Sequence, residues 1–128
     1  MAEAQKLTSM KEWNDLKKHY EKMSKVHMRD LFKNDSDRAS KYTIRNDKLG
    51  IYFDYSKNII EDETLKLLFN LVKASDLKSW TDKIFSGVKI NWTEKRAVLH
   101  SALRNMSDKP VYVDEKDVMV DIKKFLTK

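Results

Sequence analysis

Three basic side chains recur at intervals of four residues in the second half of the chain, at Arg96, His100 and Arg104. On an α-helix, residues four apart share one face, so this spacing would align two guanidinium groups with an imidazole. Such a face could hold a phosphate or a sugar hydroxyl, and the imidazole could titrate near neutral pH. The alternative is a helix packed through the apolar residues between them, with the three basic side chains solvated or hydrogen-bonded.

Other residues that could support chemistry do not fall into a recognised pattern. His19 and His27 are eight residues apart with no acidic residue in metal-ligand register, so they would meet His100 at a metal only by accident of the fold. The segment 54–57 follows a predicted strand, where functional loops often begin, but a polar strand end leading into a helix is the simpler explanation. A Gly-rich phosphate loop and a nucleophile elbow are both missing. We therefore expect no catalytic residue, metal site or cofactor in this chain.

Composition predicts one mainly helical domain. The chain has 128 residues, of which 41% are hydrophobic, and this is enough for a core. It has only two glycines and one proline, so tight turns are few. No apolar stretch approaches the roughly 20 residues that cross a bilayer, and neither a signal peptide nor a cysteine is present. These features predict a cytoplasmic protein without a membrane partner.

The formal charge of +6 admits nucleic acid as a partner, but the basic residues are scattered among acidic ones. A solvated surface explains this charge, and we expect no nucleic-acid partner.

Periodicity places the candidate residues among several short helices and one hairpin. Ser9 and Glu12 have the spacing of a capping box, which would open a helix from Met10 to Lys25. Alternating apolar residues between Tyr42 and Phe53 predict a β-hairpin. The remaining expected elements are a short helix around 28–32, helices at 61–73 and 77–85, a helix from Asn91 or Thr93 to Asn105, an extended piece at 111–113 and a last helix capped by Asp114. The helix at 61–73 is apolar around most of its circumference, which predicts burial on several sides.

The segment 85–104, FSGVKINWTEKRAVLHSALR, resembles a string found near the N-terminus of the glucose-6-phosphate isomerase (phosphoglucose isomerase) family. That string is Asn-x-Thr-Glu-x-Arg-Ala-Val-Leu-His-x-Ala-Leu-Arg. Two further segments, 54–58 and 113–119, lie at the family's usual distances upstream and downstream. The resemblance covers nearly all of this chain but only the first part of the family's polypeptide.

The resemblance implies that residues 1–128 are a single, incomplete unit at the N-terminus of such an enzyme. The family interconverts glucose 6-phosphate and fructose 6-phosphate through an enediol, without a cofactor, as a homodimer. The implied fold class is mainly α with one β-hairpin, corresponding to the N-terminal part of the large α/β domain of the sugar isomerase fold. The family's catalytic groups come from later segments, so the resemblance implies an inactive chain in which Arg96 and His100 only help to shape the site.

A second interpretation stays open at this point. The chain could be a self-standing helical module that binds a partner and has no enzyme activity.

Overall fold

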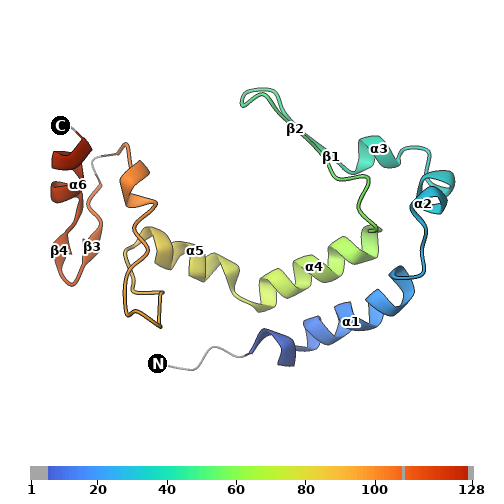
Figure 1. Cartoon of the computed structure of the whole chain (residues 1–128), viewed down its shortest axis with the longest axis horizontal. Helices are drawn as coiled ribbons and strands as arrows, with labels where there is room; N and C mark the ends of the chain where they lie inside the picture. The colour runs from blue at the N-terminus through green and yellow to red at the C-terminus, as the bar shows by residue number, and fades with distance from the viewer. Residues whose placement is uncertain (1–5, 108, 127–128) are drawn as a thin grey trace. The chain divides into compact units, whose positions relative to one another are not determined.

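The computed structural model describes residues 6–107 and 109–126, which belong to two compact units (Figure 1). The first unit is Met1–Ser75 and the second is Asp76–Lys128. Helices dominate both units, and each unit also contains one two-stranded antiparallel sheet. The mainly helical fold class with a hairpin is therefore confirmed. Within the described ranges, no helix is both long and apolar enough to cross a bilayer.

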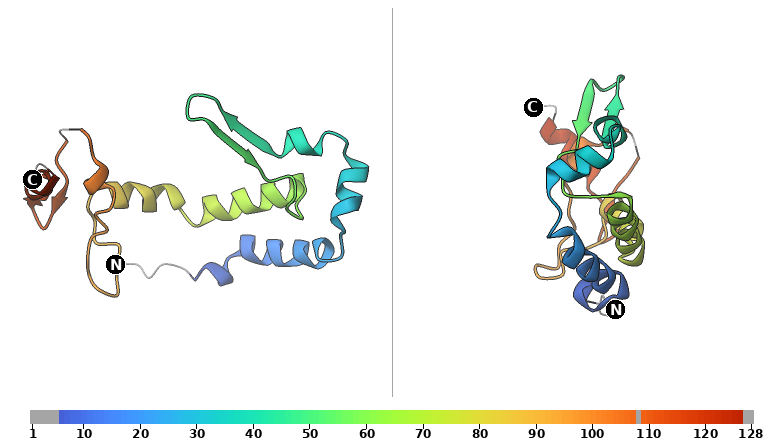
Figure 2. Two further views of the ribbon diagram at one scale, coloured as in Figure 1. Left: turned by 45° about the horizontal axis from the view of Figure 1, so that its top comes forward. Right: turned by 90° about the vertical axis from the view of Figure 1, so that its right-hand side faces the viewer.

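The first unit is framed by two 13-residue helices that lie side by side (Figures 1 and 2). Between them the chain forms two short helices and a hairpin. The elements in order are η1 (Leu7–Ser9), α1 (Lys11–Met23), α2 (Met28–Asn34), α3 (Arg38–Lys41), β1 (Thr43–Asn46), β2 (Ile51–Asp54) and α4 (Asp62–Ala74).

Polar contacts at one end of α4 fix its position against α1. Glu61 and Thr64 form a capping box, in which the side-chain oxygen of each residue accepts a hydrogen bond from the backbone amide of the other. The Thr64 hydroxyl also lies 2.7 Å from Nε2 of His19, and Lys22 Nζ lies 2.5 Å from Glu61 Oε1. The cap of α4 is thus shared with α1, which sets the register of the two helices.

The hairpin pairs Thr43 to Asn46 with Asp54 to Ile51, around a four-residue turn at 47–50. Gly50 closes this turn with a φ of 64°, in the left-handed region that glycine enters without steric cost. Leu49 N donates to the Asn46 side chain, which stabilises the turn locally. The predicted hairpin is confirmed, with the loop longer than two residues.

Within its described residues, the second unit contains three short helical elements, a small hairpin and an apolar cluster. Ala102, Val111 and Met119 are buried in it, and Leu99, Val118 and Ile122 pack against them. The elements are α5 (Leu77–Phe85), η2 (Ala102–Arg104), β3 (Tyr112–Val113), β4 (Lys116–Asp117) and α6 (Met119–Leu126).

Gly87 is required where the chain leaves α5. Its φ is 80°, and a Cβ atom there would collide with the backbone oxygen of Tyr112. Only glycine allows the loop after α5 to approach β3 this closely.

Several expected details are wrong. Ser9 and Glu12 do not form a capping box: Met10 precedes α1 without a side-chain cap, and the Ser9 hydroxyl instead donates to Lys6 O. Asp114 does not cap the last helix, because it lies at the turn of the β3–β4 hairpin with a φ of 50°. Asp117 takes that role, since its Oδ1 accepts from the amide of Met119.

The described residues do not supply the burial on several sides that the apolar circumference of α4 calls for. Packing against α1 covers one side of the helix, and none of its residues is fully buried. Leu68, Phe69 and Val72 stay exposed on the remaining surface. The apolar circumference of α4 therefore exceeds what the first unit covers.

Candidate functional site

The segment that carries the candidate residues is a loop and not the predicted α-helix. Asn91 and Arg96 pair as an isolated antiparallel bridge, with both backbone N–O distances at 3.1 Å. The Asn91 side chain accepts from Glu94 N and from the Thr93 hydroxyl, and this local bonding competes with helix formation. Lys95 has a φ of 53°, a left-handed conformation that no α-helix contains. Only Ala102–Arg104 is helical, as a short 3-10 turn.

Arg96, His100 and Arg104 therefore do not share one helix face. All three are exposed, and the side chains of Arg96 and His100 form no hydrogen bond or ion pair with any residue that the structure describes. Arg96 is held only through its backbone, at the bridge with Asn91. The expected alignment of two guanidinium groups with an imidazole is a prediction that this structure contradicts.

Two of the three basic residues still come together. His100 and Arg104 line one open hollow in the second unit, and Lys109 joins them. The apolar part of the lining includes Phe85 and Val111. The hollow concentrates positive charge, but exposed basic side chains remain hydrated, so an anion there would gain little.

Among the described residues, a dense polar arrangement surrounds Arg38 in the first unit. The Arg38 side chain is 2% exposed. Its Nε donates to Ser56 O at 2.9 Å, and its Nη2 donates to Asn58 O at 2.8 Å and Ile60 O at 3.0 Å. One guanidinium thus binds the segment that links β2 to α4 at three carbonyl oxygens.

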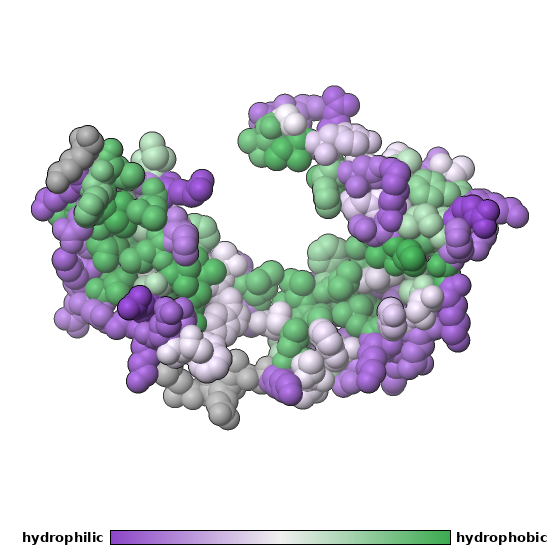
Figure 3. All heavy atoms as spheres, in the orientation of Figure 1, coloured by the Kyte–Doolittle hydropathy of each residue, from purple (hydrophilic) through white to green (hydrophobic). Residues whose placement is uncertain are grey.

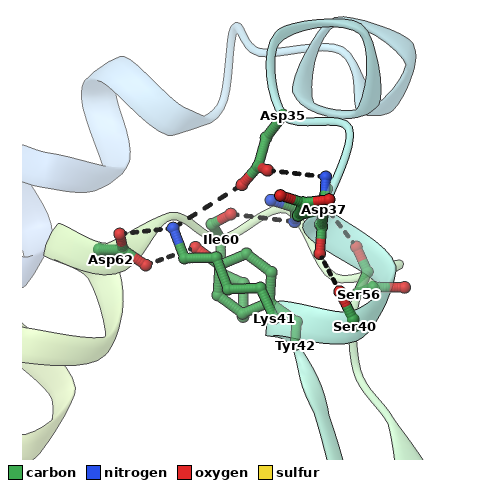
Figure 4. Close-up of polar contacts among 9 residues, drawn as sticks. Asp35, Asp37, Ser40, Lys41, Tyr42, Ser56, Ile60 and Asp62 are labelled. Atoms are coloured by element: carbon green, nitrogen blue, oxygen red, sulfur yellow. Dashed lines mark hydrogen bonds and ion pairs between the residues drawn. The ribbon is translucent and has the colours of Figure 1, made fainter.

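Aromatic rings and a carboxylate surround this guanidinium. The Arg38 Cζ lies 4.6 Å from the centroid of the buried Tyr42 ring, a distance typical of a cation–π contact. The Tyr42 hydroxyl donates to Asp62 Oδ1 at 2.8 Å, and Lys41 Nζ lies 2.6 Å from Asp62 Oδ2 (Figure 4). We call Arg38, Lys41, Tyr42, Ser56 and Asp62 the Arg38 cluster.

The charges in the Arg38 cluster shift its titrations in consistent directions. The hydrogen bond from Lys41, followed by the one from Tyr42, lowers the pKa of the Asp62 carboxyl. Burial, followed by the bond to Asp62, raises the pKa of the Tyr42 hydroxyl. The bond to Asp62 likewise raises the pKa of the Lys41 ammonium. All three shifts keep the charged carboxylate and the protonated donors in place at neutral pH, which suits a structural node more than a proton-transfer group.

The polar segment 54–57 also forms local structure. Asp54 accepts from Lys57 Nζ and from Ser56 N, both at 2.8 Å, and these bonds lower the pKa of the Asp54 carboxyl. The Ser56 side chain is 1% exposed, and its hydroxyl has no hydrogen-bond partner among the described residues. This segment ends the hairpin and presents Ser56 O to Arg38.

The histidines His19 and His27 have separate structural roles. His27 Nδ1 accepts from Arg29 N and caps α2, and His19 bonds Thr64. Among residues 6–107 and 109–126, no three His, Cys, Asp or Glu side chains gather where they could bind a metal ion.

Sequence reasoning missed Arg38 entirely. It lies in the polar stretch 34–41, where neighbouring aspartates predict only a loop. Its three carbonyl partners are 18 to 22 residues away in sequence, so no local pattern shows the contact.

Comparisons with known proteins show which family this chain resembles. Residues 54–128 match the family model of phosphoglucose isomerase. The chain is 47% identical over 120 residues to a glucose-6-phosphate isomerase of Helicobacter pylori (strain J99), a match that covers 94% of this chain and 22% of that protein. It is 45% identical over 120 residues to the enzyme of Helicobacter acinonychis (strain Sheeba), with the same coverage of both chains.

A third relative, the glucose-6-phosphate isomerase of Wigglesworthia glossinidia brevipalpis, is 47% identical over 121 residues. That match again covers 94% of this chain and 22% of the relative. The chain therefore spans 22% of the length of the curated relatives it matches. The family model covers more than half of the chain, and the relatives agree with it along nearly all of the rest. The chain belongs to the phosphoglucose isomerase family.

Proposed function

We propose that this chain is the N-terminal portion of a glucose-6-phosphate isomerase, which interconverts glucose 6-phosphate and fructose 6-phosphate. The observation that carries the proposal is a single match over 94% of the chain, at 47% identity, to proteins of that name. Its substrate would be a sugar phosphate, and the complete protein would be a cytoplasmic homodimer that binds neither nucleic acid nor membrane. No cofactor is needed for a proton shuttle between adjacent carbons.

This chain acts as a structural framework for the enzyme and has no turnover of its own. Aldose–ketose isomerisation needs an acid that opens the sugar ring, a base that moves the proton and groups that bind the phosphate. The best candidates in the chain, Arg96 and His100, are exposed, and their side chains make no hydrogen bond or ion pair with a described residue that would orient them. A catalytic group held so loosely would lose most of the rate that positioning supplies.

Both units of the chain would then belong to one incomplete domain, the N-terminal part of the large α/β domain of the sugar isomerase fold. The exposed apolar residues of α4 support this, because a finished domain would cover them. In that larger domain Arg96 and His100 would help to shape the site as auxiliary residues. No residue of this chain is proposed as catalytic.

A chimera tests the proposal. The matched 120 residues of the Helicobacter pylori enzyme are replaced by the matched residues of this chain, and fructose 6-phosphate turnover is followed in a coupled assay. We expect turnover from the chimera and only background from this chain alone, with the unaltered relative as the positive control.

A folded chimera without turnover would contradict the proposal. It would favour the interpretation of the chain as a helical interaction module without enzyme activity. Turnover by this chain alone, rising with its concentration and surviving repurification, would contradict the framework role.

A further inference from the structure

The second unit presents one methionine almost entirely to solvent. Met106 is 96% exposed, whereas Met23 is 5% exposed and Met119 is 3% exposed. Met10 and Met28 are half-buried. The described methionines therefore place the same thioether chemistry in very different surroundings, and Met106 lies at the accessible end of that range.

A hydrogen-bonded turn holds Met106 in this position. The Asn105 side-chain oxygen accepts from Ser107 N at 3.0 Å and from the Ser107 hydroxyl at 2.6 Å. The Asn105 side-chain nitrogen donates to Lys109 O at 3.1 Å, and its backbone amide donates to Ala102 O. Because the side chain of Asn105 forms these bonds, the turn does not depend on the thioether of Met106.

Exposure of an apolar side chain is not unusual in this unit. Figure 3 shows hydrophobic side chains at the surface of the second unit, and Phe125 and Leu126 are 80% and 63% exposed. Their hydrocarbon groups do not react with a peroxide. Met106 differs from them because its sulfur carries a lone pair that a peroxide oxidises.

The surroundings of Met106 also suit an oxidised product. Met106 lines the open hollow of the second unit together with His100, Arg104 and Lys109. A thioether sulfur is only a weak hydrogen-bond acceptor, whereas a sulfoxide is polar. Arginine and lysine side chains supply donors, so a sulfoxide in this hollow would meet both solvent and protein donors.

We propose that Met106 is a reversible oxidation site, and that a peroxide reacts there before it reacts at the other methionines that the structure describes. The sulfur lone pair attacks one oxygen of hydrogen peroxide, an S–O bond forms and the O–O bond breaks. Sulfur loses two electrons, the peroxide is reduced to water, and methionine becomes methionine sulfoxide. Methionine sulfoxide reductases reverse this change with a dithiol as the reductant.

The consequence of oxidation should differ sharply between Met106 and Met119. Met119 is buried in an apolar cluster with Ala102 and Val111, where a sulfoxide would introduce a polar group. Met106 contributes almost no buried surface, so its sulfoxide removes no packing. The chain can therefore take up and release one oxygen at Met106 without losing its fold. This inference does not depend on the proposed function.

Peptide mass spectrometry after limited oxidation of this chain with hydrogen peroxide tests the proposal. We expect sulfoxide to form at Met106 about 10-fold or more faster than at Met23 and Met119, with Met10 and Met28 between them. In urea, where the chain is unfolded, the rates at these five positions should become equal to within about 2-fold. A rate at Met106 no higher than that at any of the other four in the folded chain would overturn the proposal.

Two substitutions by glutamine, a polar side chain of similar length, provide a matched pair. Met106→Gln should melt at the temperature of the unaltered chain, whereas Met119→Gln should melt several degrees lower or fail to fold. A lowered melting temperature for Met106→Gln, or for the chain oxidised at Met106 alone, would contradict oxidation without loss of structure.

The final measurement addresses reversibility. A methionine sulfoxide reductase with dithiothreitol should restore the unoxidised mass of the Met106 peptide in the folded chain. Restoration only after unfolding in urea would overturn the assignment of Met106 as a reversible site.

Discussion

The Arg38 cluster of the first unit buries its arginine and binds it with hydrogen bonds. The loop 91–104 of the second unit leaves its arginines exposed. Arg38 is 2% exposed and bound at three carbonyl oxygens, whereas Arg96 is exposed and held only by its backbone. The cluster carries no recognisable motif, while the loop contains the string that most resembles the isomerase family. A recognisable sequence therefore need not be well packed within this chain, and the residues that hold the first unit together are inconspicuous in the sequence.

The comparison predicts its largest difference in the free energy of unfolding when each arginine is replaced by alanine. Arg38→Ala removes three charge-assisted hydrogen bonds and leaves three carbonyl oxygens without their donor, at a cost of about 3 kcal/mol or more. Arg96→Ala, at an exposed position, should change the free energy of unfolding by less than about 0.5 kcal/mol. Urea unfolding of both variants of this chain, resolved by residue with hydrogen exchange, measures the difference.

Arg38→Lys sharpens the same test. Lysine keeps the charge but cannot donate in the fixed fork that reaches Ser56 O and Ile60 O together, so most of the destabilisation should remain. If Arg38→Ala and Arg96→Ala cost the same, the contrast between the two regions is wrong.

A second loss of stability is expected at Gly87, where two backbone segments of the second unit lie in close contact. Gly87→Ala would force a left-handed conformation on alanine and push its Cβ into the backbone of Tyr112. The left-handed conformation alone costs about 1–2 kcal/mol, and the collision adds to it. Gly50→Ala, which has a φ of 64° but nothing within 4 Å of the added Cβ, should cost only the conformational part. Thermal melts compare the melting temperatures of the two variants. A smaller decrease for Gly87→Ala than for Gly50→Ala would show that the close approach of Gly87 to the Tyr112 backbone is not needed for stability.

The outcome for individual elements shows what sequence reasoning could reach. The hairpin was predictable because its apolar residues alternate, and α1, α4 and α5 were predictable from their 3.6-residue period. The short β3–β4 hairpin was not predicted, because its turn places the non-glycine residues Asp114 and Glu115 at positive φ. Such local conformations depend on contacts elsewhere in the unit.

The candidate site was predicted less well than the fold. Helical spacing of Arg96, His100 and Arg104 suggested one face. Hydrogen bonds accepted by the Asn91 side chain and the left-handed conformation of Lys95 instead form a turn. The Arg38 cluster was missed because the hydrogen-bond acceptors of Arg38 are backbone carbonyl oxygens on the far side of the hairpin in sequence. Backbone acceptors leave no signature in a sequence.

A smaller effect comes from the acidic group of the Arg38 cluster. Hydrogen bonds from Lys41 and Tyr42 lower the pKa of Asp62 below its ordinary value of 3.8, so the folded first unit binds this proton less readily than the unfolded chain. The stabilisation is therefore fully present above about pH 4 and is lost as the pH falls through the lowered pKa of the folded state. Unfolding free energies measured between pH 7 and pH 2 should fall less steeply for Asp62→Asn than for the unaltered chain.

Asp76→Asn is the control for this pH dependence. Asp76 lies at the start of the second unit, and its side chain makes no capping hydrogen bond to α5. Its substitution should leave the acid dependence of the first unit unchanged. If the free energy of unfolding depends on pH equally for Asp62→Asn and the unaltered chain, the cluster has no electrostatic role in stability.

The most direct test of the account compares His100→Ala in two settings. In this chain alone His100 is exposed and its side chain makes no hydrogen bond or ion pair with a described residue, so the melting temperature should not change. In the active chimera we predict a fall in turnover of about 10-fold or more with the melting temperature preserved, because a displaced site residue costs rate more than stability. Normal turnover with a lowered melting temperature would contradict the account and show that His100 only packs.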